Sequence, residues 1–326
     1  MSTRTVSRSS GKASSDIKQG VTLLKIGVIG LGNMGSRITQ RFLEAGVEVG
    51  VYDINEQAMN EMVAAGAVAE RTPAQLASNY PYVITLLPNA AIVTETVLGE
   101  DGLAEGMSPT SLLIEMSTSE PSSTKELHAI LTSKGLRMID APVSGGVSKA
   151  RNGTLTIMVG GEEVDFEEVE PLLRKIGENV MHVGAIGAGH TIKALNNMVS
   201  ATTLAVTGEA IALGVKLGLD PNKMLSVINT STGRSASSEV KFPGQILNRK
   251  FDSGFSLDLM VKDLTIANQI AESENVSLDI AAANLQVWKQ AQKEKFADHT
   301  MIVKHIENKV EVEINGVQDT ANVISS

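Results

Sequence analysis

One stretch of sequence decides the fold of the N-terminal half: Lys25-Ile-Gly-Val-Ile-Gly-Leu-Gly-Asn-Met-Gly35. Its last three glycines stand in G-x-G-x-x-G spacing, directly after an apolar run and directly before a helical pattern. Glycine is needed there for a tight turn, for close approach of the backbone to a pyrophosphate and for contact between helix and strand. The first N–H groups of the helix then face the phosphates. The stretch predicts a dinucleotide site that includes the whole loop: Gly30, Leu31, Gly32, Asn33, Met34 and Gly35.

An acidic residue follows the second predicted strand: Asp53, 18 residues after Gly35. A carboxylate at the end of that strand accepts hydrogen bonds from the hydroxyls of a ribose and repels a 2′-phosphate. The residues that follow, Ile54-Asn-Glu56, offer no arginine to receive such a phosphate. The sequence therefore predicts NAD as the cofactor in preference to NADP. The alternative role for Asp53 is an N-cap of the next helix.

Short apolar runs alternate with helical patterns along the first half of the chain. Strands are predicted at 26–29, 47–52, 82–87, 111–115, 136–140 and 154–159, with helices at 36–45 and 56–65 between the first three. This alternation predicts an α/β fold of the Rossmann type, a doubly wound parallel sheet with helices on both faces. From about residue 189 the strand runs vanish, and Asp220-Pro221 is typical of an N-cap followed by the first helical position. We expect an all-α C-terminal domain, entered through a long interdomain helix at about 191–217.

Four segments follow from this pattern. Residues 1–24 are Ser-rich and basic, which predicts a disordered leader, with a mitochondrial transit peptide as the alternative to a cytoplasmic protein. Residues 25–187 form the predicted NAD-binding domain, and 188–308 form a helical domain for substrate binding and oligomerisation. Residues 309–326 are a tail of unknown structure. The most apolar stretch, 198–215, carries Glu209 and several small polar residues, so we expect a buried helix and no membrane span.

Composition excludes several classes of function. The net charge is −9 at pH 7, and no Lys/Arg-rich stripe occurs, which argues against nucleic acid as a partner. The chain has no cysteine, so disulfides, thiolate nucleophiles and Cys-based metal sites are excluded. Its 5 histidines are scattered, and we predict no metal site. Chemistry must therefore come from lysines, carboxylates, amides, hydroxyls or a bound cofactor.

Four blocks, in this order, resemble the β-hydroxyacid dehydrogenase family, which includes 3-hydroxyisobutyrate dehydrogenases and tartronate semialdehyde reductases. They are Gly30-Leu-Gly-Asn-Met-Gly35, Asp140-Ala-Pro-Val-Ser-Gly-Gly146, Gly189-His-Thr-Ile-Lys-Ala-Leu-Asn-Asn197 and Lys262-Asp263. The resemblance covers residues 25–293. It implies a Rossmann-type domain joined by a long helix to a helical domain of the kind found in 6-phosphogluconate dehydrogenase, and a dimeric or tetrameric assembly. Gly208 and Gly214 in the predicted long helix could allow a partner helix to pack closely.

The third block contains the predicted catalytic residue, Lys193. Lysine serves as an acid or base only if burial or a nearby cation lowers its pKa, and a lysine on a helix is otherwise most often a solvated surface residue. Asn196 and Asn197 follow at i+3 and i+4, on the same face of the helix. The resemblance implies that Lys193 is the general acid/base and that Asn197 and Asn196 anchor the substrate.

Three further segments are predicted to reach the site. The glycines of Ser144-Gly145-Gly146 allow consecutive N–H groups to face a carboxylate, and the resemblance assigns this loop to substrate. Leu87 and Pro88, and after the next strand Thr118, lie where the carboxyl ends of strands meet, and the resemblance makes them cofactor contacts. The alternative for Thr118 is an N-cap before the helix that Pro121 opens.

The fourth block, by its residues alone, is an amphipathic helix with a solvated charge pair. The resemblance instead implies that Lys262 contacts the cofactor, that Asp263 lies near the substrate and that Phe255 packs beside the nicotinamide. These roles would place the site between the two domains. His190 stands where many members of the family have glutamine. It could tune the site or be inert, and we favour an inert residue.

Together these observations predict an NAD-dependent oxidoreductase that interconverts a short 3-hydroxy acid and its semialdehyde or keto acid, with Lys193 as general acid/base. A 3-hydroxyisobutyrate dehydrogenase-like activity is preferred, and tartronate semialdehyde reductase or a threonate-type dehydrogenase are alternatives. Imine reductases are related, but they usually replace the catalytic lysine. The alternative from another class is a regulatory NAD-binding protein, which would be expected to lose Lys193, Asn196 and Asn197. We expect a homodimer or homotetramer that contacts neither nucleic acid nor membrane.

Overall fold

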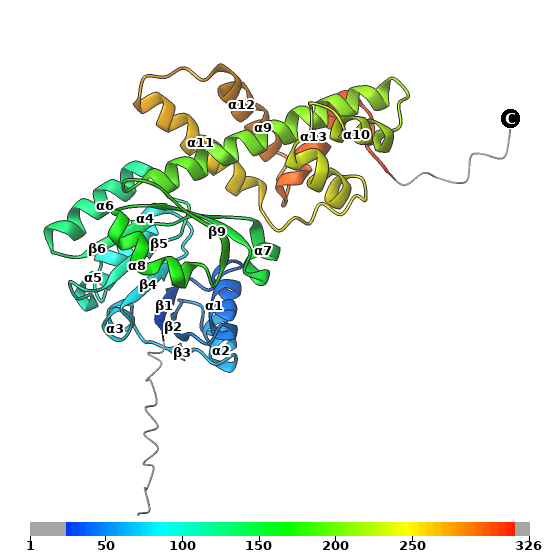
Figure 1. Ribbon diagram of the computed structural model, residues 1–326. Helices are drawn as coiled ribbons and strands as arrows, with labels where there is room; N and C mark the ends of the chain where they lie inside the picture. The colour runs from blue at the N-terminus through cyan, green and yellow to red at the C-terminus, as the bar shows by residue number, and fades with distance from the viewer. Residues whose placement is uncertain (1–23, 317–326) are drawn as a thin grey trace, which may run out of the picture.

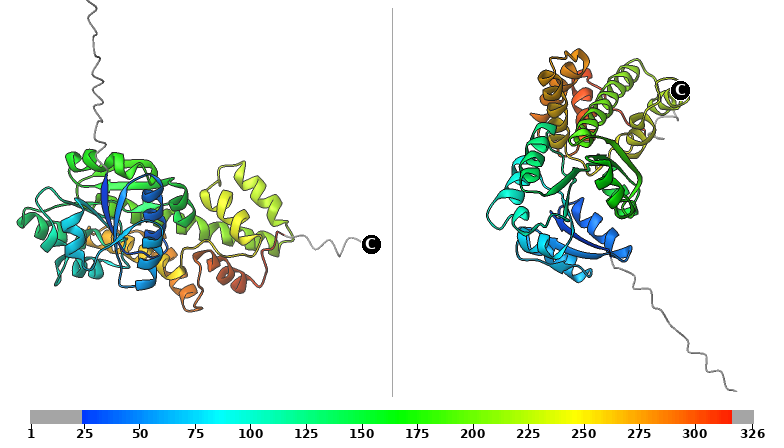
Figure 2. Two further views of the ribbon diagram at one scale, coloured as in Figure 1. Left: turned by 90° about the horizontal axis from the view of Figure 1, so that it is seen from below. Right: turned by 60° about the vertical axis from the view of Figure 1, so that its left-hand side comes forward.

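The computed structural model describes residues 24–316, and the predictions made for residues 1–23 and 317–326 fall outside that range. The chain forms an N-terminal α/β domain and a C-terminal helical domain, connected by one long helix (Figure 1). Figure 2 shows from two further sides that the helical domain lies beyond one edge of the α/β domain. The predicted fold class, a Rossmann-type domain followed by an all-α domain, is confirmed.

The sheet has a parallel part and a mixed part. The parallel strands are β1 (Lys25–Ile29), β2 (Glu48–Tyr52), β3 (Val68–Ala69), β4 (Tyr82–Thr85), β5 (Leu112–Glu115) and β6 (Arg137–Asp140). They lie in the order β3-β2-β1-β4-β5-β6, which places the crevice for a dinucleotide between the ends of β1 and β4. Next to β6 runs β8 (Leu155–Gly160), antiparallel, which pairs with β7 (Val143–Ser144) and β9 (Gly177–Gly184).

The parallel pairing that the sequence predicts runs from β3 to β6, and the pairing beyond β6 is mixed. Strands β3 and β7 have 2 residues each, too few to show a pattern. Strand β9 contains glycines at both ends and is mostly half-exposed or exposed, so it lacks the apolar run that marks a buried strand. It pairs with only β8, at the edge of the sheet.

Helices cover both faces of the sheet, as the doubly wound prediction requires. One face carries α1 (Gly35–Glu44), α7 (Gly146–Asn152) and α8 (Glu163–Leu173), and the other carries α3 (Pro73–Asn79), α4 (Ala90–Leu98) and α6 (Pro121–Ser133). The shorter α2 (Glu56–Ala64) and α5 (Leu103–Gly106) complete the layers. Neighbouring strand residues enter different cores: Ile84 and Ile114 pack with the first set of helices, Val83 and Leu113 with the second. Strands buried on both sides explain the continuous apolar runs in the sequence.

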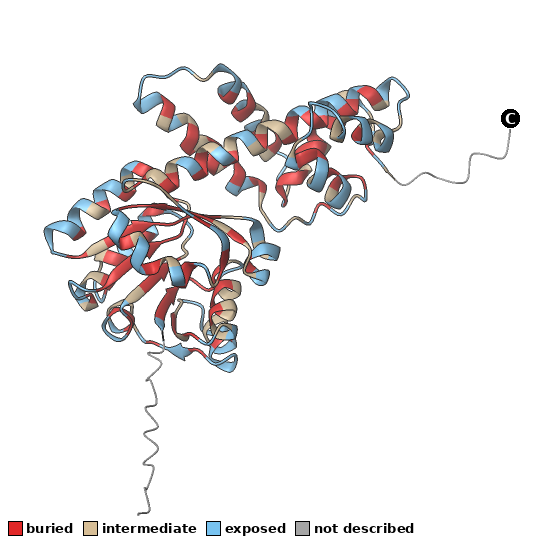
Figure 3. Cartoon of the chain, in the orientation of Figure 1, coloured by how far each residue is buried: buried red, intermediate tan, exposed pale blue. Residues whose placement is uncertain are grey.

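The long helix α9 (Ala188–Lys216) begins 3 residues before the predicted start, after Gly187, whose φ is +86°. It is followed by α10 (Pro221–Asn229), a π-helix η1 (Ser237–Ile246), α11 (Leu257–Ser273), α12 (Asp279–Gln292), a 3-10 turn η2 (His299–Met301) and α13 (Ile302–Val310). Asp220 caps α10 as predicted, since its carboxylate accepts from the N–H of Lys223. A core that includes Leu204, Phe242 and Trp288 holds these helices together, and a smaller cluster of Ala194, Ile266 and Ala267 joins α9 to α11. Buried residues line the inner faces of the helices (Figure 3).

Gly208 and Gly214 of α9 do not face outward. A Cβ at Gly208 would lie 2.9 Å from Ile306 of α13, and one at Gly214 would lie 2.2 Å from Met224 of α10. The expectation that they admit a partner helix is wrong, because they admit neighbours of the same chain. Among the described residues, α9 is the one helix long and apolar enough to cross a membrane by length and composition, and 44% of that window is buried in the fold.

Candidate active site

At two glycines of the loop between β1 and α1, the fold leaves no room for a side chain. A Cβ at Gly30, whose φ is +93°, would lie 2.2 Å from the carbonyl oxygen of Leu86, and one at Gly35 would lie 1.8 Å from that of Gly30. A Cβ at Gly32 would meet no atom of residues 24–316 within 4 Å. Gly32 lines the interdomain cavity, so the space beside it is open to a group that approaches the backbone. The loop therefore fits the pyrophosphate of a dinucleotide.

Asp53, which directly follows β2, is hydrogen-bonded to this loop. Its Oδ2 accepts a hydrogen bond from the N–H of Leu31 at 2.5 Å, and its Oδ1 accepts from the N–H of Asn55 at 2.8 Å. The N-cap of α2 is Asn55, whose side chain accepts from Gln57 and Ala58. The N-cap alternative for Asp53 is wrong, and its carboxylate lies at the cavity.

The cavity has a volume of about 600 Å³ and runs from the glycine loop to α9 and α11. Most of the residues predicted from the sequence line it: Gly30, Gly32, Asn33, Met34, Gly35, Asp53, Leu87, Pro88, Thr118, Gly145, Gly146, Lys193, Phe255, Lys262 and Asp263. Four predicted residues lie outside its lining, namely Leu31, Ser144, Asn196 and Asn197. Both domains thus contribute to one cleft of the size that cofactors and small substrates occupy.

Lys193 projects from the first turns of α9 into this cavity and is buried. Its Nζ donates a hydrogen bond to the carbonyl oxygen of Val143 at 2.8 Å. Burial lowers the pKa of Lys193, Asp263 acts in the opposite direction, and Lys262 lowers the pKa further. A solvated surface role for this lysine is therefore wrong. A buried amine with a lowered pKa is suited to exchange a proton.

Asn197 and Asn196 have different surroundings although they are neighbours. The Nδ2 of Asn197, which is buried, donates to Oδ2 of Asp263 at 2.6 Å. Asn196 is exposed, and its Nδ2 donates to Oδ1 of Asn197 at 3.3 Å. In this structure the two amides orient Asp263 rather than line the cavity.

Asp263 is 1% exposed, which makes the interpretation of Lys262-Asp263 as a solvated charge pair wrong. Its Oδ1 is buried and has no hydrogen-bond partner among residues 24–316. Burial raises the pKa of Asp263, and Lys193, Lys262 and the amide of Asn197 oppose that effect. Its Oδ1 is therefore a free acceptor near the amine of Lys193.

Lys262 connects the two domains. From α11 its Nζ donates to the carbonyl oxygens of Pro88, at 3.2 Å, and Thr118, at 2.9 Å. Both loops follow parallel strands of the sheet. The N-cap alternative for Thr118 is wrong, because α6 begins after Glu120. Phe255, before α11, lines the same cavity.

The turn after β7 is formed by two consecutive glycines. Gly145 has φ +133° and Gly146 has φ +68°, values that a residue with a side chain rarely adopts. Both glycines line the cavity, whereas Ser144 is not among the residues that line it. This arrangement suits a bound carboxylate.

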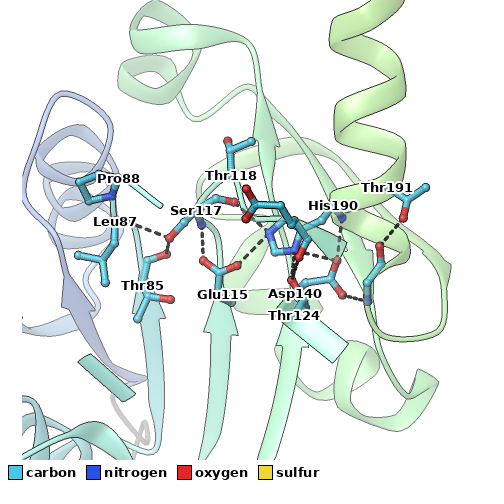
Figure 4. A network of polar contacts seen from close by, with 12 residues as sticks. Thr85, Leu87, Pro88, Glu115, Ser117, Thr118, Thr124, Asp140, His190 and Thr191 are labelled. Atoms are coloured by element: carbon cyan, nitrogen blue, oxygen red, sulfur yellow. Dashed lines mark hydrogen bonds and ion pairs between the residues drawn. The ribbon is translucent and has the colours of Figure 1, made fainter. Parts of the chain in front are cut away.

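His190, the residue predicted to have no role in the site, lies outside the lining of the cavity in a buried polar network. His190 is buried at the start of α9, between Glu115 of β5, Asp140 of β6 and Thr124 of α6 (Figure 4). The sequence signal for His190 was its position 3 residues before Lys193. Its partners come from distant segments of the chain, so the sequence alone does not indicate what it contacts. Within residues 24–316, no three His, Asp or Glu side chains gather in a way that could hold a metal ion.

Both domains match models of known protein families. Residues 25–184 match the family model described as the NAD binding domain of 6-phosphogluconate dehydrogenase, and residues 187–306 match that described as NAD-binding of NADP-dependent 3-hydroxyisobutyrate dehydrogenase. The chain is 37% identical to the 2-(hydroxymethyl)glutarate dehydrogenase of Eubacterium barkeri, over 90% of this chain and 99% of the relative. It is 37% identical to the mitochondrial 3-hydroxyisobutyrate dehydrogenase of Drosophila melanogaster, over 81% of this chain and 82% of that protein.

A solved structure is similar over the same extent. It is that of Mycobacterium tuberculosis 3-hydroxyisobutyrate dehydrogenase with L-serine, with a TM-score of 0.81 and 30% identity, and the match covers 87% of this chain and 99% of the other. A nicotinamide-binding sheet domain and a helical domain that supplies a buried lysine define a class of dehydrogenases that act on CH–OH groups. The chain belongs to the β-hydroxyacid dehydrogenase family.

Proposed function

We propose that this protein oxidises a short 3-hydroxy acid with NAD and catalyses the reverse reduction, and that Lys193 is the general acid/base. The observation that carries the proposal is the position of Lys193: its amine is buried in the interdomain cavity that the turn of Gly145 and Gly146 and the free acceptor of Asp263 also line. A base, a carboxylate-binding turn and an acceptor for a further hydrogen bond are the groups that a small hydroxy acid needs.

The residues of the chain divide the work as follows. Neutral Lys193 takes the proton of the substrate hydroxyl, which its lowered pKa favours. The N–H groups of Gly145 and Gly146 bind the carboxylate, and Asp263 accepts a hydrogen bond from the substrate. A bound nicotinamide supplies the acceptor for the hydride that leaves the carbinol carbon. Lys262 holds the helical domain against the loops of Pro88 and Thr118, which helps to exclude water.

Relatives and the cavity together support the substrate class. By their names, the relatives act on 3-hydroxyisobutyrate and 2-(hydroxymethyl)glutarate, and both molecules carry a hydroxymethyl group on the carbon next to a carboxylate. Around the turn of Gly145 and Gly146 the cavity is lined by the apolar side chains of Val143 and Val147. These side chains favour a small apolar substituent, so 3-hydroxyisobutyrate is the preferred candidate, ahead of tartronate semialdehyde and threonate.

NAD is the proposed cofactor. Asp53 presents a negative charge where NADP would carry its 2′-phosphate, and Ile54, which is 92% exposed, offers no positive charge there. Asn55 is engaged as the cap of α2. These features support NAD over NADP.

A homodimer or homotetramer is part of the proposal. The side of α9 that its own chain leaves exposed carries Ile192, Val199, Val206 and Leu213, spaced 7 residues apart. Such a stripe supports packing against a second copy. The division into domains at 25–187 and 188–308 is also part of the proposal, and the matched ranges 25–184 and 187–306 support it. We further propose a cytoplasmic location, with mitochondrial import as the alternative.

The test is a set of initial rates with 3-hydroxyisobutyrate, L-serine, 2-(hydroxymethyl)glutarate, glycerate and threonate, each with NAD and NADP. We expect NAD reduction with at least one acid, highest with 3-hydroxyisobutyrate, and loss of that activity in Lys193→Ala. If NADH binds but none of these acids is oxidised, the regulatory alternative replaces the enzyme. A preference for NADP would overturn the cofactor assignment.

A further inference from the structure

His190 lies outside the cavity, yet it is the centre of a buried network that the proposed mechanism does not use. It belongs to the first turn of α9, and its ring is enclosed by Glu115, Asp140 and Thr124 from three other elements (Figure 4). Both carboxylates are buried, and the ring is fully enclosed. Buried ionisable groups are costly unless they are paired, so this arrangement calls for a physical explanation.

The hydrogen-bond partners of the ring determine its protonation. Nε2 lies 3.0 Å from the carbonyl oxygen of Ser117 and 2.9 Å from Oε2 of Glu115, and both are acceptors. Nδ1 lies 2.8 Å from Oγ1 of Thr124, whose own hydroxyl donates to the carbonyl oxygen of Glu120 at 3.2 Å. Thr124 can therefore act as an acceptor toward the ring. Each ring nitrogen then faces an acceptor, an arrangement that fits an imidazolium with a hydrogen on both nitrogens.

The two carboxylates are arranged as its counter-charges. Asp140 accepts from the N–H of Gly187 at 2.6 Å and from the N–H of His190 itself at 2.8 Å, and its Oδ2 lies 3.6 Å from Nδ1. Glu115 accepts from the N–H of Ser117 at 2.8 Å. Burial lowers the pKa of His190, but Glu115 and Asp140 outweigh that effect and raise it. Burial raises the pKa of Glu115, but His190 and Ser117 outweigh it and lower that pKa. Burial also raises the pKa of Asp140, and there His190 and the N–H groups of Gly187 and His190 oppose the rise without cancelling it.

The network joins the start of α9 to the loops after β4 and β5, which we call the cofactor loops. Ser117 contacts the ring of His190 through its carbonyl oxygen and donates its N–H to Glu115. Its Oγ accepts from the N–H of Leu87 at 2.9 Å. Leu87 and Ser117 line the cavity at the ends of β4 and β5. On the other side, His190 stands 3 residues before Lys193 on the same helix. A displacement of the first turn of α9 would therefore move the amine of Lys193 relative to both loops.

We propose that His190 is a positioning residue, whose imidazolium holds the start of α9 between Glu115 and Asp140 and so sets the position of Lys193 relative to the cofactor loops. The inference rests on the proposed role of Lys193. Without the positive charge, two buried carboxylates face each other across the helix start, and the helix shifts. An error of this kind in the placement of a reacting group costs about 10- to 100-fold in rate.

The kinetic test uses His190→Gln, an amide that keeps one donor and removes the charge. His182→Gln is the matched control, because His182 also bonds a backbone carbonyl, that of Gly161, but lies on β9 away from the cavity. We expect kcat to fall about 10- to 100-fold in His190→Gln, measured well below the unfolding temperature, with a displaced pH profile of kcat, and to stay unchanged in His182→Gln. The double variant Glu115→Gln/His190→Gln removes one of the two facing carboxylates, and with it their repulsion, and should recover a large part of kcat.

A merely structural role predicts a lower unfolding temperature with unchanged kcat and pH profile, and that result would overturn the proposal. A double variant no better than His190→Gln would overturn it as well. Should His190→Gln fail to fold, NMR of the wild-type histidine rings decides the question without activity. We expect one ring of the 5 to keep both N–H groups at a pH near 8, above the ordinary histidine pKa of about 6.5. If every ring is neutral there, the proposal fails, whereas a wild type inactive with all hydroxy acids contradicts only the proposed function.

Discussion

Two glycines of the loop between β1 and α1 should respond to alanine in opposite ways. At Gly32 the backbone is outside the left-handed region, and a Cβ would meet no atom of the described residues within 4 Å. Alanine there should leave the free protein intact or stabilise it by about 0.4–1 kcal/mol, because the unfolded chain loses freedom. The added methyl group occupies the space beside the loop that we assign to the pyrophosphate, so NADH affinity should fall about 10- to 100-fold, or ~1.4–2.7 kcal/mol.

Gly35→Ala should instead damage the fold. Its Cβ would lie 1.8 Å from the carbonyl oxygen of Gly30, and backbone cannot yield as a flexible side chain does. Overpacking of this kind costs about 1–3 kcal/mol. For a domain of 150–250 residues each kcal/mol lowers Tm by about 2–4 °C. A lower Tm is therefore the mark of Gly35→Ala, and retained stability with weak NADH binding is the mark of Gly32→Ala.

The assay combines thermal unfolding without ligand and NADH fluorescence titration for the wild type and three variants. The control is Gly244→Ala in η1, where a Cβ also meets no described atom within 4 Å but which lies outside the cavity. It should change neither quantity by a large amount. NADH binding to Gly32→Ala with wild-type affinity would refute the reasoning, because the open space would then not be the cofactor's.

Three further predictions concern the chemistry of the cavity. Lys193→Ala and Lys193→Arg should each lose about 10²- to 10⁴-fold in kcat while NADH titration shows unchanged affinity, since a guanidinium keeps its proton; an active arginine variant would contradict the acid/base role. Asp263→Asn should move the rising limb of the pH profile for alcohol oxidation to lower pH. Asp263 raises the pKa of Lys193, so without its charge the amine becomes neutral at a lower pH. A limb that moves to higher pH would contradict this sign. Asp53→Asn should raise the NADP-to-NAD ratio of kcat/KM by about fivefold, because removing one like charge near a 2′-phosphate relieves ~1 kcal/mol; a ratio that stays constant would remove Asp53 from cofactor selection.

Features set by local sequence were predictable. The glycine loop, the acid at the end of β2, the cap at Asp220 and the change from alternating elements to helices each depend on residues close together in the chain. The mixed edge of the sheet was not predictable, because β7 has 2 residues and β9 has no apolar run.

Side-chain roles within the cavity depended on rotation and on long-range contacts. By their spacing, Asn196 and Asn197 both lie close to the helix face of Lys193. Consecutive residues of a helix are nevertheless about 100° apart around its axis, and only Asn197 faces inward, where it bonds to Asp263. His190 could not be assigned a role because Glu115, Asp140 and Thr124 lie between 50 and 75 residues away in the chain. Such partners meet only when β5, β6 and α6 assemble around the start of α9.

The central claim is that the cavity brings a hydroxy acid, Lys193 and a nicotinamide together for hydride transfer. The direct measurement is incubation of the wild-type protein with NAD and 3-hydroxyisobutyrate that carries deuterium on its carbinol carbon, followed by NMR of the NADH formed. The account predicts deuterium at C4 of the nicotinamide ring and a rate that falls by about 10²-fold or more in Lys193→Ala. Formation of NADH without deuterium, or equal transfer by Lys193→Ala, would contradict it.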